Sequence, residues 1–176
     1  MYKRQVTVFQ ADYDRLHTQE LAPTRTTVFF GNGMEGRLRG LETWGSYQAS
    51  PSWRLHAGFT RLWQDLRLKP GSIDTADSLA SAQGSNPSRQ WLLRSSLDLP
   101  RQVAFDLTAR YVSDLAAPPV PSYLAVDMRL SWQPQADLEL SITGQNLFGP
   151  AHGEFTAEAT RSAFSRAVFV ELASRF

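Results

Sequence analysis

Apolar and polar residues alternate along five segments of this chain, as they do in strands that have one apolar and one polar face. The segment 103–111 shows the pattern most fully. Its apolar set is Val103, Phe105, Leu107, Ala109 and Tyr111, and its intervening set is Ala104, Asp106, Thr108 and Arg110. The same alternation runs through 53–60, 91–99, 124–132 and 138–145. Because a shift of one residue would exchange the two faces, agreement among the segments favours real strands over coincidence.

Short and long connections alternate between these segments. The short ones are Ser50–Ser52, Leu99–Arg101 and Pro134–Ala136, and the long polar ones cover about 15–37, 65–88, 114–121 and 149–161. Short turns at one end and long loops at the other are typical of outer-membrane barrels. The sequence therefore predicts an all-β antiparallel up-and-down meander of about eight strands, with the short turns at one end. The expected strands are Val6–Leu16, Leu38–Ala49, Trp53–Trp63, Gln90–Leu99, Gln102–Ser113, Ser122–Gln133, Asp137–Leu147 and Ala163–Phe176. The stretch Lys69–Arg89, rich in Ser, Gly, Ala and Asp, is expected to be a flexible extracellular loop.

Composition limits the alternatives. The chain has 176 residues, a formal net charge of +1 and no cysteine, which argues against nucleic-acid binding and removes disulfides and thiolate metal sites. No stretch approaches the ~18 consecutive apolar residues of a transmembrane helix, but in a transmembrane barrel only alternate residues face lipid. The alternation also fits a soluble sandwich or lipocalin-like barrel with its apolar face inside, so both remain open here. Five tryptophans near strand ends suit a membrane-interface girdle or a core, namely Trp44, Trp53, Trp63, Trp91 and Trp132.

The sequence carries no recognisable catalytic or cofactor motif. Asp12 and Asp14 share a strand face at roughly the 7 Å spacing of a glycosidase pair, but nothing nearby completes such a site. His17, His56 and His152 are too scattered for a metal site. We therefore expect no enzymatic activity, no cofactor and no bound metal.

From Leu99 onward the sequence resembles the C-terminal end of TonB-dependent outer-membrane receptors. The supporting stretches are Arg110–Val112, Val120–Tyr123, Val126–Trp132, Leu138–Ser141, Gly144-Gln145-Asn146-Leu147-Phe148, His152, Glu154-Phe155, Arg161 and the terminal Phe176. The segments Phe9–Leu16, with Tyr13-Asp14-Arg15-Leu16, and Gly40–Glu42 look like earlier strands of the same barrel. Val168, Val170, Leu172 and Phe176 share one face of the last strand and form the expected outer-membrane assembly signal. Ser174 and Glu171 depart from the usual large apolar residue and glycine of that signal.

The resemblance implies that the chain is the C-terminal part of a larger, about 22-stranded, barrel whose lumen is closed by a plug domain. On this interpretation residues 6–176 are barrel and the plug is missing. Residues 1–5 resemble a translated sequencing adaptor, and the alternative is a short native basic terminus.

The resemblance also implies a function in the outer membrane of a Gram-negative bacterium. The family imports scarce ligands, most often ferric siderophores and sometimes cobalamin or saccharides. The implied partners are outer-membrane lipid, the barrel-assembly machinery, the missing plug and strands, the TonB-ExbB-ExbD system and a small-molecule ligand, with no nucleic acid. Candidate ligand contacts in the extracellular loops are Phe29, Phe30, Tyr123, His152 and Phe155. The alternatives are a self-standing eight-stranded outer-membrane barrel with a structural or adhesion role, and a soluble ligand-binding barrel.

The charged residues opposite the apolar sets are expected to line a lumen. They are Arg54, Arg94, Asp98, Asp106, Arg110, Asp127, Arg129, Glu139, Glu171 and Arg175. Neighbouring strands can pair them, for example Asp106 with Arg94 or Arg129. The favoured interpretation is a solvated, mutually neutralised wall, and the alternative is contact with the plug.

Overall fold

The computed structural model describes residues 2–24, 26–154, 160 and 162–175. One antiparallel sheet of eight strands has the order β1-β2-β3-β4-β5-β8-β9-β10. Its strands are β1 (Tyr2–Leu21), β2 (Val28–Ser50), β3 (Trp53–Leu68), β4 (Arg89–Leu99), β5 (Val103–Val112), β8 (Tyr123–Gln135), β9 (Leu138–Gln145) and β10 (Ala167–Ser174). The loops carry a helix, α1 (Ser78–Gly84), and a small hairpin of β6 (Leu115–Ala116) and β7 (Pro119–Val120). The predicted all-β meander is confirmed.

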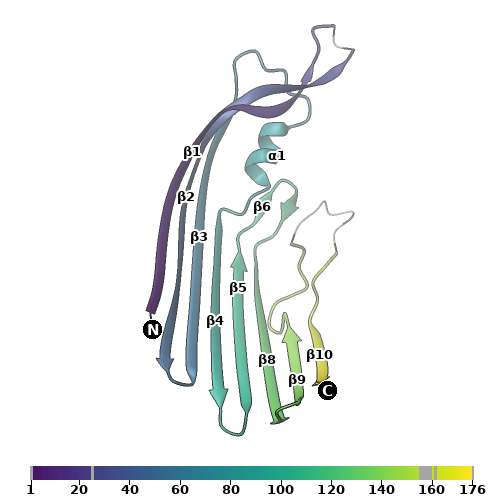
Figure 1. Ribbon diagram of the computed structural model, residues 1–176. Coiled ribbons are helices and arrows are strands. Elements are labelled where there is room, and N and C mark those ends of the chain that lie inside the picture. Colours follow the sequence, from purple (N-terminus) through teal and green to yellow (C-terminus); the bar gives the residue numbers. More distant parts are fainter. Residues whose placement is uncertain (1, 25, 155–159, 161, 176) are drawn as a thin grey trace.

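The short turns and the long loops lie at opposite ends of the sheet (Figure 1). Ser50 pairs with Trp53, Leu99 with Val103 and Gln135 with Leu138, so each short turn joins two neighbouring strands directly. We refer to the end of the sheet with these short turns as the turn end. The opposite end, where α1 and the β6–β7 hairpin lie, is the loop end (Figure 1). The predicted arrangement of turns and loops is confirmed.

The first two strands are longer than the sequence predicted. Residues 15–37 were expected to form a loop, but β1 continues to Leu21 and β2 begins at Val28. The pairing shifts register between Tyr13 and Leu16 and again between Leu16 and Thr18. Such irregularities break the alternation of side chains on which the prediction depended, while the backbone pairing goes on. Tyr2–Gln5 also belong to β1 and pair with β2.

The loop between β3 and β4 contains a helix that the sequence analysis did not predict. The Ser78 amide and hydroxyl donate to the Asp74 carboxylate at 2.7 and 2.8 Å, which satisfies an amide at the start of α1. Gln83 Nε2 donates to the Leu66 carbonyl at 2.8 Å and ties α1 to β3. The contact between Gln83 and Leu66 is tertiary, and the sequence of this stretch of small polar residues gives no sign of it. In the described part of the chain, no helix has the length and apolar character needed to cross a membrane.

The register confirms that the sheet has one apolar and one polar face. On β5, Phe105 lies between Leu97 and Leu130, and Ala109 lies between Leu93 and Val126. The apolar face continues across the sheet to β9 and β10, where Ile142 is opposite Val170. These side chains stay uncovered by the rest of the chain. Val170, for example, is 70% exposed, and the buried apolar residues among those described are Met34, Leu66, Val120 and Ala125.

Aromatic side chains border the apolar face at both ends. Trp53 and Trp132 lie at the turn end, whereas Trp91 stacks on Tyr111 at the loop end with ring centroids 5.9 Å apart. From Val103 to Tyr111 the strand extends about 26 Å along its own axis, and this span of nine residues falls in the range of about 9–11 residues that a tilted strand needs to cross a bilayer. Trp44 does not join this border, because the register places it on the polar face, where its Nε1 donates to Gln5 at 3.0 Å.

Candidate functional site

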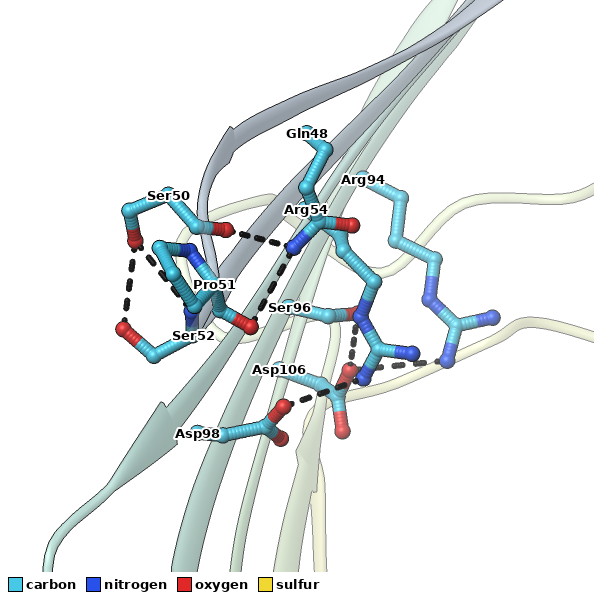
Figure 2. Close-up of polar contacts among 9 residues, drawn as sticks. All are labelled: Gln48, Ser50, Pro51, Ser52, Arg54, Arg94, Ser96, Asp98 and Asp106. Carbon is cyan, nitrogen blue, oxygen red and sulfur yellow. Dashed lines mark hydrogen bonds and ion pairs between the residues drawn. The ribbon is translucent and has the colours of Figure 1, made fainter. Parts of the chain in front are cut away.

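The turn end of the polar face carries a network of ion pairs (Figure 2). Arg54 pairs with Asp98 at 3.4 Å, and Arg94 pairs with Asp106 at 3.5 Å. The Ser96 hydroxyl donates to the same Asp106 oxygen at 2.5 Å. The charged side chains come from β3, β4 and β5, and successive inward positions of neighbouring strands bring them together.

Of the two partners predicted for Asp106, Arg94 forms the ion pair and Arg129 does not. Arg129 stands directly opposite Asp106 in the register but pairs with Glu139 of β9 at 2.5 Å instead. Side-chain exposure in these pairs lies between 24% and 54%, and solvent-screened pairs contribute only about 0–1 kcal/mol each. This arrangement fits a wetted wall in which Arg54, Arg94 and Arg129 each have a carboxylate partner.

The β2–β3 turn beside this network is held by its own side chains. Gln48 Nε2 donates to the Ser50 carbonyl at 2.5 Å and lies 3.4 Å from the Pro51 carbonyl (Figure 2). The Ser50 and Ser52 hydroxyls lie 3.2 Å apart, and the Ser52 amide donates to the Ser50 hydroxyl at 3.3 Å. Local side-chain bonds of this kind favour a tight turn over a continued strand.

A second group of polar residues lies at the loop end of the polar face. We name it the loop-end cluster, and it consists of Arg110, Tyr123, His152 and Glu154. Arg110 Nη2 lies 2.7 Å from Glu154 Oε1, and its guanidinium carbon lies 5.5 Å from the centre of the Tyr123 ring. The Tyr123 and His152 rings stack with centroids 4.1 Å apart, and His152 Nε2 lies 3.5 Å from Glu154 Oε1. The His152 and Glu154 side chains are only 9% and 17% exposed, so the cluster combines a cation, a carboxylate and stacked rings at the mouth of the polar face.

Asn146 holds the segment after β9 in the position that builds this cluster. Asn146 has a positive φ of 48° and is almost fully buried. Its amide donates to Asp127 Oδ1 at 2.9 Å, and its Nδ2 donates to the carbonyls of Pro150 and Phe164 at 3.0 and 3.1 Å. Asparagine tolerates the left-handed conformation better than most residues. The Gly144–Phe148 motif therefore has a structural role, since it turns the chain back over the sheet.

The structure brings together some of the predicted ligand contacts and separates others. Tyr123 and His152 are neighbours in the loop-end cluster. Phe29 and Phe30 instead lie within β2, near the tip of the β1–β2 hairpin, and are 48% and 74% exposed. Phe155 lies outside the described residues. Sequence reasoning assigned Arg110 only to the lumen wall and did not connect it with Tyr123 or Glu154, because the loop that carries Glu154 folds back over β5.

The remaining motif residues have mixed outcomes. Gly144 and Gln145 end β9, Leu147 donates its amide to the Val126 carbonyl at 2.9 Å, and Phe148 is 71% exposed. Arg161 lies outside the described residues. In the expected assembly signal, Val168, Val170 and Leu172 do share the apolar face of β10, since they pair with Gly144, Ile142 and Leu140. Phe176, the fourth member, also lies outside the described residues.

Both carboxylates of the Asp12/Asp14 pair have basic partners. Asp12 pairs with Arg37 at 2.5 Å, and Asp14 pairs with Lys69 at 2.9 Å. Within the described ranges, no three His, Cys, Asp or Glu side chains gather into a group that would hold a metal ion.

A buried carboxylate fastens the loop before α1 to the β1–β2 hairpin. Glu20 Oε1 accepts hydrogen bonds from the hydroxyls of Ser72 at 2.6 Å and Thr18 at 2.7 Å, and Oε2 accepts from the Ile73 amide at 2.5 Å. The bonds from Ser72 and Thr18, with that from Ile73, hold the Glu20 pKa below its usual 4.5. Gly33 lies against the Glu20 carboxylate, because an added Cβ at this position would overlap the carboxylate and the Ser72 side chain.

Acidification should weaken the hydrogen bonds that the Glu20 carboxylate accepts. A carboxylate whose pKa is lowered by folding stabilises the folded state above its unfolded pKa, and this stabilisation is lost as the pH falls through the folded pKa. For Glu20, the stabilisation should therefore begin to decrease when the pH falls below 4.5. It should be lost completely only when the pH is below the lowered pKa that the carboxyl has in the folded protein. Hydrogen exchange at the Ile73 amide, corrected for its intrinsic pH dependence, should show protection at neutral pH that falls in acid. In Glu20→Gln the protection should be weaker at neutral pH and should fall less in acid, and equal pH profiles in the two proteins would contradict the assignment.

A cavity of about 680 Å³ lies between α1 and the first three strands. Its wall includes Tyr13, Leu38 and Leu66 from the sheet and Ser81 and Ala82 from α1. All three sheet residues belong to the face that carries the ion pairs nearer the turn end. The helix of the long loop is thus folded over the polar face, and not over the apolar one.

Comparisons with known proteins were made for both sequence and structure. No family model matches the chain, and no curated protein matches its sequence. Solved structures match it in fold. The siderophore receptor PiuA from Acinetobacter baumannii is similar over 98% of this chain, with a TM-score of 0.78 and 17% identity. The ferric-catecholate import receptor Fiu from E. coli K12 is similar over 97%, with a TM-score of 0.72 and 16% identity, and the copper transporter OprC over 99%, with a TM-score of 0.63 and 14% identity.

This chain has the fold of a TonB-dependent receptor barrel. The fold implied by the sequence resemblance is therefore confirmed. The chain spans 26%, 24% and 29% of the lengths of PiuA, Fiu and OprC, about a quarter of each. These structurally similar proteins are receptors and transporters, among them a siderophore receptor and a copper transporter.

Proposed function

We propose that this chain is part of the wall of a TonB-dependent outer-membrane transporter that imports a scarce ligand, with a ferric siderophore as the favoured ligand. The observation that carries this proposal is the uncovered apolar face, bordered by aromatic residues at both ends and as long as a tilted strand needs to cross a bilayer. A soluble barrel would hide that face inside. Here the chain folds its loop helix over the opposite face, which carries the ion pairs nearer the turn end, as expected if that face lines a lumen.

The proposal extends to the parts of the protein beyond these eight strands. In the described residues, β1 pairs only with β2, and β10 pairs only with β9, so the sheet is open at both edges. Unpaired strand edges cost several kcal/mol per backbone group in hydrocarbon, which favours further strands that complete a larger barrel. We propose that these strands and a plug domain belong to the same protein, that residues 6–176 are its barrel segment and that residues 1–5 are not native. A self-standing eight-stranded barrel would instead require β1 to pair with β10.

We further propose that the loop-end cluster contacts the ligand at the mouth of the lumen, with Phe29 and Phe30 as additional contacts from the β1–β2 hairpin. Aromatic rings next to a cation suit a planar or anionic ligand. The TonB-ExbB-ExbD system would supply energy through the plug, and the barrel-assembly machinery would insert the protein into the outer membrane.

The proposed function can be tested by transport. The full-length gene is expressed in a Gram-negative strain that lacks its own siderophore receptors, and growth on single ferric siderophores is measured under iron limitation. Rescue by at least one siderophore, lost when TonB is deleted, is the expected result. If only cobalamin or a saccharide restored growth, the proposed transporter function would stand, but the ligand would not be a ferric siderophore. Growth that is restored even without TonB would contradict the proposal.

A further inference from the structure

The polarity of the two faces inverts towards the loop end of β1, β2 and β3. Between the turn end and the row of Phe59 and Trp91, the apolar face of these strands carries apolar residues. Beyond that row, towards the loop end, the same face carries charged and polar residues. They are Gln10, Asp12, Glu35, Arg37, Arg39, Arg61, Asp65, Arg67 and Arg89. The opposite face becomes apolar over the same rows and holds the cavity under α1. This inversion marks the height at which the outer surface leaves the hydrocarbon and enters the polar layer.

Three arginines stand at that boundary on adjacent strands. Arg61 of β3 and Arg89 of β4 are directly opposite each other in the register. Arg39 of β2 is opposite Trp63 and therefore lies diagonally next to Arg61 on the same face. Arg61 and Arg89 lie only two residues, about 7 Å, beyond the aromatic row of Phe59 and Trp91. This is the depth of lipid headgroups above an aromatic girdle.

These three arginines differ from the arginines farther out in forming no ion pair, although Arg39 lies close enough to Asp12 to help lower the pKa of that carboxyl. Arg37 pairs with Asp12, and Arg67 pairs with Glu35 at 2.8 Å. Within the part of the chain that the structure describes, none of the three at the boundary forms an ion pair. Their contacts are a hydrogen bond from Arg39 to Gln10 at 3.2 Å and the packing of the Arg61 guanidinium 5.4 Å from the Trp63 ring centre.

Like charges directly opposite each other destabilise an antiparallel pair unless an anion neutralises them. Guanidinium groups bind phosphate oxygens through paired hydrogen bonds, and this geometry favours arginine over lysine at such sites. The cluster also lies beside apolar surface that would accept acyl chains, which a site for a free anion would not need. We propose that Arg39, Arg61 and Arg89 bind the phosphate groups of an anionic lipid in the outer leaflet. This inference rests on the proposed membrane placement of the apolar face.

The test uses the full-length protein in neutral detergent and diphosphorylated lipid A as the probe. Arg61→Gln/Arg89→Gln is compared with Arg37→Gln/Arg67→Gln, which removes the same charge from the same face but at positions that already have carboxylate partners. Each basic residue near an anionic surface changes binding by about fivefold, so the first variant should bind lipid A about 25-fold more weakly. The second variant should bind like the unmodified protein, and dephosphorylated lipid A should bind the unmodified protein as weakly as lipid A binds the first variant.

Two results would overturn the inference. One is equal lipid A affinity in Arg61→Gln/Arg89→Gln and in the unmodified protein, and the other is full competition by inorganic phosphate, which would indicate a site for a free anion. Insertion into neutral phosphatidylcholine vesicles is measured in parallel for every protein. Failure of the unmodified protein to insert would count against the proposed function and against this inference with it, whereas normal insertion with unchanged lipid A affinity would remove this inference alone.

Discussion

Leu107→Arg in the full-length protein should lower the free energy of unfolding in a lipid bilayer by about 2–4 kcal/mol. Leu107 lies midway along the apolar face of β5, between the borders marked by Val103 and Tyr111, and faces Ser95 and Met128. A guanidinium at this height would sit near the centre of the hydrocarbon, far from either headgroup layer. The measurement is reversible chemical unfolding in lipid vesicles.

The matched control is Thr108→Arg, one residue along the same strand. Thr108 belongs to the polar face and lies between Arg94 and Asp127 in the register, so a new cation there would be exposed to water and would meet one neighbour of each charge. Its substitution should change the unfolding free energy by less than about 1 kcal/mol. If Thr108→Arg proved the more damaging of the two, the apolar face would have to be the interior of a soluble barrel.

Asn146→Ala should release the segment that follows β9, with a local cost of about 2–4 kcal/mol. The substitution removes two hydrogen bonds from Nδ2, leaves the carbonyls of Pro150 and Phe164 without these donors and forces alanine into a positive φ. The amides of His152 and Phe164, which bond to each other's carbonyls, report on this segment directly. Their hydrogen exchange should speed up strongly, while amides in β5 keep their protection.

Asn146→Gly separates the two contributions. Glycine accepts the positive φ without strain but cannot donate the two hydrogen bonds, so its effect should fall between those of asparagine and alanine. Full protection of His152 in the glycine variant would show that the side-chain bonds do not hold the segment.

The sequence was sufficient for the fold where strands are regular. In 103–111 and 124–132 each residue keeps its face, so alternation alone predicts both the strands and their register neighbours, as Phe105 opposite Leu130 illustrates. It failed at β1, where register shifts after Tyr13 hide a continuing strand. It also failed at α1, whose stability depends on Asp74 and on contacts with β3.

The candidate site could be predicted only in part. Tyr123 and His152 were both expected among the ligand contacts of the extracellular loops, and the structure stacks their rings, which the sequence did not predict. The contribution of Arg110 could not be anticipated, since it depends on how far the segment carrying Glu154 folds back over β5. The distribution of paired and unpaired arginines on the outer surface likewise depends on side-chain geometry. The register places both Asp12 and Asp65 opposite Arg37, one on each neighbouring strand, and only the side-chain geometry shows that the ion pair forms with Asp12.

The central claim, that the apolar face meets lipid and the polar face meets water, is tested most directly by a spin-label scan. This chain has no cysteine, so a single cysteine at each position from Phe105 to Ala109 gives a unique attachment site within it. Collision rates are measured in the membrane-embedded full-length protein with oxygen, which concentrates in lipid, and with a water-soluble nickel complex. Labels at 105, 107 and 109 should favour oxygen and those at 106 and 108 should favour nickel, with a period of two residues. The opposite phase, or no alternation, would contradict the account.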